Sequence, residues 1–182
     1  MILDALLAFD TAYTFVAGST GSIAAHDSTN TIDLGITSGI PSSASGGGAR
    51  DIGIGDDPAM KLMIVVTATI TSGGAGTLAI ALNGAIDNGA GLPAAYSVWW
   101  TSPTYALATL VAGERLYDMD MPRPPAGIAI PRFLKMVYTI GTATLTGGVL
   151  QSYIVLDRDD AAYSGTDNSV RGGYPAGINV AN

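Results

Sequence analysis

The residue types that could carry catalysis are few in this chain. His26 is its one histidine, and cysteine is absent from all 182 residues. A Ser–His–Asp centre would have to be built on His26, whose neighbours Asp27 and Ser28 are ordinary loop-forming residues. A zinc site is equally unexpected, because one histidine and otherwise only carboxylates make an unusual set of zinc ligands. We therefore expect no enzyme and no catalytic residue.

Carboxylates form the next candidate group, since paired acids can bind calcium or act as an acid/base pair. Three clusters occur: Asp56-Asp57, Asp118 with Asp120, and Asp157 with Asp159-Asp160. None has the spacing of an EF-hand loop, and the Gly-rich turns contain no phosphate-binding Gly-Lys-Ser/Thr motif. We expect no metal site and no cofactor, with a structural calcium ion as the alternative that stays open.

Trp99 and Trp100 are the third candidate, because exposed tryptophans on a β-sandwich can stack on sugars. Adjacent residues of a regular strand point to opposite faces, so at most one of the two would be exposed. Packing in the core or at an interface is the favoured interpretation. Carbohydrate binding is the alternative.

Composition favours strands and loops over helices. Apolar residues make up 48% of the chain, charged residues only 13%, and Glu occurs once, at Glu114. Eight basic residues are scattered against 15 acidic ones, giving a net charge of −7, which argues against a nucleic-acid partner. No apolar run reaches the length of a membrane span, and MILDALLAFD lacks the basic residues of a signal peptide. We expect a soluble protein that keeps its N-terminus.

Alternating apolar residues predict an all-β domain from residue 60 onward. MKLMIVVTATIT places Met60, Leu62, Ile64, Val66, Ala68 and Ile70 on one strand face, with threonines opposite. Later strands are expected in TLAIALN, AAYSVWWTS, YALATLVA and RLYDMDM. About eight strands separated by turn signals favour an antiparallel β-sandwich or jelly roll over residues 60–157.

The longest strand pair is expected at 131–157, PRFLKMVYTIGTATLTGGVLQSYIVLD. Leu134, Met136, Tyr138 and Ile140 share one face of the first strand. Leu150, Ile154 and Leu156 share a face of the second, interrupted by Ser152. With Gly141 and Gly147-Gly148 between them, the two strands are predicted to form a hairpin of the core.

Residues 1–59 are interpreted as a long irregular arm with loops that belongs to the same domain, and residues 158–182 as a polar tail. Leu3, Leu6 and Leu7 have the spacing of a helical turn. The apolar residues of this segment either pack on their own domain or dock on a neighbouring subunit. They are Ile2, Leu3, Leu6, Leu7 and Phe9. Further along, Ile32, Leu34, Ile52 and Ile54 are expected to pin a surface loop at 38–48 to the sandwich.

Three stretches carry a resemblance to a known family: STNTIDLG at 28–35, RDIGIGDD at 50–57, and PRFLKMVYTIGTATLTGG at 131–148. Together with the apolar N-terminus, they resemble the capsid cement (decoration) proteins of tailed bacteriophages. That resemblance implies a jelly-roll fold, a homodimer, the major capsid protein as partner, and a place on the outside of the virion's capsid. It implies no catalysis.

Two functions are therefore expected from the sequence. The first is a cement protein, made in the host cytoplasm, which bridges capsid subunits. Its candidate interface residues are Ile2, Leu3, Leu6, Leu7, Phe9, Trp99 and Trp100. The second is a carbohydrate-binding β-sandwich, as in a receptor-binding or adhesin module.

Overall fold

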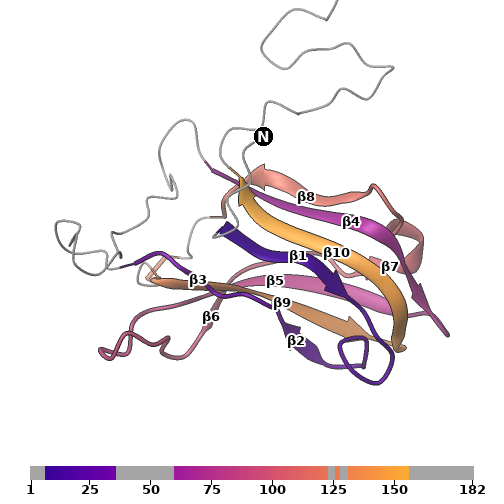
Figure 1. Cartoon of the computed structure of the whole chain (residues 1–182), viewed down its shortest axis with the longest axis horizontal. Helices are drawn as coiled ribbons and strands as arrows, with labels where there is room; N and C mark the ends of the chain where they lie inside the picture. The colour runs from indigo at the N-terminus through magenta and orange to yellow at the C-terminus, as the bar shows by residue number, and fades with distance from the viewer. Residues whose placement is uncertain (1–6, 36–59, 123–125, 128–130, 156–182) are drawn as a thin grey trace, which may run out of the picture.

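The chain folds into two antiparallel β-sheets that pack face to face (Figure 1). The structure is a computed structural model, and it describes residues 7–35, 60–122, 126–127 and 131–155. Its strands are β1 (Ala8–Thr14), β2 (Ala25–Asp27), β3 (Ile32–Asp33), β4 (Lys61–Ser72), β5 (Thr77–Ala85), β6 (Ser97–Thr101), β7 (Tyr105–Ala106), β8 (Arg115–Asp120), β9 (Phe133–Gly141) and β10 (Leu145–Val155). The predicted β-sandwich is confirmed.

The strand order is that of a jelly roll. One sheet runs β1-β10-β4-β8 and the other β2-β9-β5-β6, with β3 added beside β9 and β7 beside β5. The early strands thus pair with the late ones, β1 with β10, β2 with β9 and β4 with β8, while β5 pairs with β6. This is the pattern of one long hairpin wrapped into two layers.

The expected hairpin at 131–157 is corrected by this topology. β9 and β10 follow each other directly, but β9 pairs with β2, β3 and β5 whereas β10 pairs with β1 and β4. The turn between them therefore crosses from one sheet to the other. The turn between β4 and β5 does the same. Alternation shows which face of a strand is buried, and both a hairpin and a crossing corner satisfy it.

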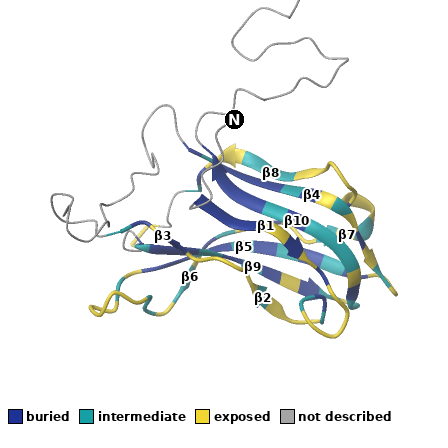
Figure 2. Ribbon diagram, viewed as in Figure 1, coloured by how far each residue is buried: buried dark blue, intermediate teal, exposed yellow. Residues whose placement is uncertain are grey.

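The predicted core faces are confirmed in the described residues (Figure 2). Leu134, Met136, Tyr138 and Ile140 of β9 are all buried. Met60 and, in β4, Leu62, Ile64, Val66 and Ile70 are also buried, whereas Ala68 of the same predicted face is half-buried. Thr67, Thr69 and Thr71 are exposed. Leu150, Ser152 and Ile154 of β10 face the same core, and Leu156 lies outside the described residues.

Two segments differ from the sequence interpretation. YALATLVA is a strand only at Tyr105–Ala106, after which Leu107–Thr109 form the short 3-10 helix η2. Residues 7–35, the described part of the first 59, contribute three strands to the sandwich, because β1 extends one sheet and β2 and β3 extend the other. Ile32 and Leu34 are buried at that edge as expected, whereas Ile52 and Ile54 lie outside the described residues.

A polar seam closes the edge of the sandwich where β1 faces β2 and β3. The Ser28 amide donates to the Met136 carbonyl of β9 at 2.8 Å, and the Ser28 hydroxyl accepts from the Met136 amide at 3.1 Å. Two residues on, the Asn30 amide donates to the Phe9 carbonyl of β1 at 3.0 Å. The start of STNTIDLG therefore ties one sheet to the other.

The buried carboxylate of Asp10 extends this seam into the core, where the residue is only 2% exposed. It accepts hydrogen bonds from the Tyr138 hydroxyl at 2.6 Å and the Thr29 amide at 2.8 Å. The Ser152 hydroxyl lies 2.7 Å from the Tyr138 oxygen. Burial, and then the charge of Asp10, raise the pKa of Tyr138 well above its ordinary value, so the phenol stays protonated and donates.

The opposite edge, between β6 and β8, is closed by aromatic side chains. The rings of Trp100 and Tyr117 lie 4.4 Å apart between centroids, and the Tyr105 hydroxyl donates to the Leu116 carbonyl at 2.9 Å. In the described residues, polar contacts thus close one edge of the sandwich and aromatic side chains close the other.

We predict that Tyr138→Phe destabilises the protein by about 1–3 kcal/mol, because a buried carboxylate and the Ser152 hydroxyl each lose a partner. Urea unfolding followed by circular dichroism measures this free energy. Tyr105→Phe is the matched control, since it removes a hydroxyl that bonds a half-buried carbonyl at the edge. Equal losses in the two variants would contradict the special role given to the Asp10 network.

Candidate interaction surface

Two of the candidate interface residues from the N-terminus lie in the chain's own core. Leu7 and Phe9 are buried and belong to the main hydrophobic cluster. Their position agrees with packing on their own domain, which is one of the two alternatives that the sequence left open. From Ala8 the chain is strand rather than helix. Ile2, Leu3 and Leu6 lie outside the described residues.

Trp99 and Trp100 both pack against the core instead of pointing to opposite faces. The pairing of β5 with β6 shifts register between Leu82 and Asn83, so an extra residue is inserted at Trp99. Trp99 is 6% exposed and its indole crosses Gly84, where an added Cβ would lie 2.7 Å from Nε1. Trp100 is half-buried against Tyr117. The pair is therefore not an exposed stacking platform.

The side chains considered for catalysis or metal binding are engaged elsewhere. His26 Nε2 donates to the Ser22 carbonyl at 3.0 Å rather than to Asp27, which pairs with Lys135 at 2.7 Å. Asp118 and Asp120 share the outer face of β8 and pair with different cations. Within the described ranges no group of three His, Asp or Glu side chains could hold a metal ion. Asp56, Asp57, Asp157, Asp159 and Asp160 lie outside them.

Each lysine and arginine in the described part of the chain has an acidic partner. Lys61 pairs with Asp120, Arg115 with Asp118, and Lys135 with Asp27. Arg132 pairs with both Asp33 and Asp87. The described surface therefore presents no unpaired basic cluster of the kind that binds phosphates.

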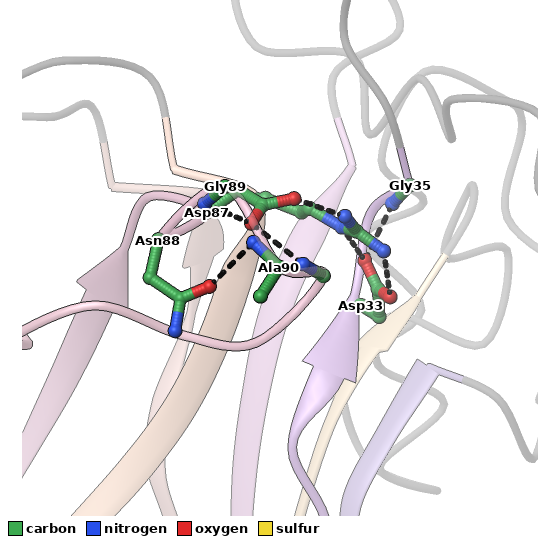
Figure 3. Close-up of polar contacts among 8 residues, drawn as sticks. Asp33, Gly35, Asp87, Asn88, Gly89 and Ala90 are labelled. Carbon is green, nitrogen blue, oxygen red and sulfur yellow. Dashed lines mark hydrogen bonds and ion pairs between the residues drawn. The ribbon is translucent and has the colours of Figure 1, made fainter.

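Arg132, just before β9, forms a polar cluster with Asp33 and Asp87, the two acids labelled in Figure 3. Its guanidinium donates to both carboxylate oxygens of Asp33 at 2.9 Å, a bidentate geometry that fixes the planar group. A third nitrogen donates to Asp87. This side chain joins β3, β9 and the loop that follows β5.

Asp87 also organises its own loop. One carboxylate oxygen accepts from the amides of Gly89 at 2.8 Å and Gly91 at 2.9 Å, while Asn88 accepts from the Ala90 amide at 2.8 Å. The Gly89 hydrogen bond above all, with further help from Arg132, lowers the pKa of Asp87 below its ordinary value of 3.8. The turn signal Asp-Asn-Gly was available in the sequence, but the distant partner Arg132 was not.

Exposed large apolar side chains mark the remaining candidate surface. Those in the described residues are Val16, Ile23, Ile86, Leu92, Val98, Val111 and Met119. Three of the seven fall within residues 86–98, in and just after the loop that Asp87 organises. Sequence reasoning missed Ile86 and Leu92, because single apolar residues in a Gly-rich loop give no periodic pattern.

We predict that the Asp87 carboxyl titrates below pH 3.8, and that Arg132→Gln moves its midpoint upward without reaching 3.8, because the Gly89 amide remains. Since the native pKa is depressed, the stabilisation exists above the ordinary pKa and is lost as pH falls through the native one. Carboxyl carbon NMR across an acid titration measures the midpoint. An unchanged midpoint in Arg132→Gln would contradict the contact.

In the described part of the chain no helix is long and apolar enough to cross a membrane. No curated protein matches the chain. A protein-family model does match, over residues 17–154, and its description reads simply Bbp16. The matched range holds β2 to β9 and nearly all of β10, well over half of the 182 residues. The chain belongs to the Bbp16 family.

Proposed function

We propose that this protein is a capsid cement protein of a tailed bacteriophage. In this proposal it binds the outer surface of the icosahedral head as a homodimer, bridges major capsid protein subunits and stabilises the shell. It acts as a structural protein of the virion, without catalysis or a cofactor.

The observation that carries the proposal is the extent of the family match. It spans all three stretches that resemble cement proteins, at 28–35, 50–57 and 131–148. The family name hints at a phage protein and says nothing of capsid decoration. The capsid, the dimer and the bridging role are our inference from the resemblance.

The architecture supports a load-carrying role. The stretches at 28–35 and 131–148 meet in the polar seam, where Ser28 bonds Met136 and Thr29 and Tyr138 share Asp10. Hydrogen bonds close one edge of the described sandwich and aromatic side chains close the other, so the domain is a firm platform. A cement protein can rely on many modest contacts, because repetition over a lattice adds avidity.

The alternative of a carbohydrate-binding module finds no supporting observation. Its platform was Trp99 with Trp100, and the structure buries the first and packs the second against Tyr117.

We predict that the protein co-purifies with intact phage heads in near-stoichiometric amounts relative to the major capsid protein. Gradient-purified virions, gently disrupted and analysed by quantitative mass spectrometry, provide the measurement. Heads that lack the protein should also lose DNA at a lower temperature. Recovery of the protein only as free material in the lysate would contradict the proposal.

A further inference from the structure

Residues 86–94 form a short hairpin-like projection between β5 and β6, which we call the finger. The Ala94 amide donates to the Ile86 carbonyl at 2.8 Å, Asp87 and Pro93 form a β-bridge, and the Asn88 amide donates to the Leu92 carbonyl at 2.9 Å. The finger extends from the sandwich as an exposed loop next to the base of β6 (Figure 2).

The two faces of the finger differ in chemistry. Residues paired across an antiparallel ladder point to the same side, and the side alternates along each strand. Asp87 and Pro93 therefore share one side, which Arg132 contacts. Ile86 and Leu92 share the other, and they are 47% and 60% exposed.

The finger is held in place before any partner arrives. Three hydrogen bonds from backbone amides to Asp87 and Asn88 close its turn, and Arg132 clamps Asp87 to Asp33 of β3. Gly89 and Gly91 have φ of +90° and +78°, a conformation that costs glycine little. A rigid apolar projection loses little conformational entropy on binding, which favours association.

The charge pattern indicates what the finger fits. From Asn88 to Val98 no residue is charged, and Asp87, which pairs with Arg132, lies on the opposite side. Val98 on the adjoining strand β6 is 52% exposed and adds a further apolar side chain to this uncharged surface. Phosphate-rich surfaces are recognised by cations, which the finger does not offer. An uncharged apolar depression on the surface of a folded protein is complementary to the finger.

We propose that Ile86 and Leu92 of the finger insert into an uncharged apolar depression on the major capsid protein. This inference rests on the proposed function and adds which face of the sandwich meets the shell. The Asp33–Arg132–Asp87 clamp acts as a positioning device that holds the apolar pair outward.

The test uses phage heads that lack the protein, with purified full-length chain added back and bound protein measured after sedimentation. Leu92→Ser is the main variant. Ile23→Ser is its matched control, because Ile23 is 58% exposed and lies at the other end of β9, where the Ile140 amide bonds the Ala24 carbonyl. Arg132→Gln loosens the finger and leaves its apolar pair intact. Melting temperatures and sedimentation velocity accompany each variant.

We expect Leu92→Ser to weaken head binding by about tenfold or more, as loss of a central apolar anchor does. Arg132→Gln should weaken it less, and Ile23→Ser should bind like the wild type. Equal binding of Leu92→Ser and the wild type would overturn the finger proposal and leave the proposed function standing. Wild-type protein that fails to bind would overturn both. A dimer lost in Leu92→Ser, with its head binding otherwise normal, would assign the finger to self-association and overturn capsid docking.

Discussion

The buried contact between Asp10 and Tyr138 is the polar constraint that favours one alignment of the two layers, which the apolar core holds together. Asp10 lies on β1 of one sheet and Tyr138 on β9 of the other, and Ser152 of β10 completes the group. A carboxylate in an apolar core costs free energy unless its oxygens are bonded, and here each oxygen has a donor. The hydrogen-bonded group of Asp10, Tyr138 and Ser152 therefore stabilises one alignment of the two sheets relative to others.

The contact between Asp10 and Tyr138 also explains how the irregular strand β1 is positioned. The pairing of β1 with β10 shifts register on both sides of Asp10, so backbone hydrogen bonding alone specifies the position of β1 weakly. Asp10 can bond Tyr138 and Thr29 in one position only, which sets the residues of β1 that face inward. The polar seam from Ser28 to Asn30 then becomes a consequence of the same alignment.

Sequence reasoning found the faces of the strands but not their partners. The alternation around Leu62 and Tyr138 predicted burial correctly, because a strand side chain meets the core whatever strand lies next to it. The hairpin at 131–157 failed for the same reason. The register shift at Trp99 depends on how β6 pairs with β5, and the bond from Arg132 to Asp33 connects residues far apart in the chain. Local sequence patterns predict neither feature.

These features together describe a firm sandwich with a preformed apolar finger at one end, in a chain of the Bbp16 family. A cryo-EM map of the assembled phage head tests this account most directly. The account predicts density for the jelly roll on the outer surface of the shell, with Leu92 of the finger in contact with the major capsid protein. A complete, symmetric shell that carries no density for this chain on its exterior would contradict it.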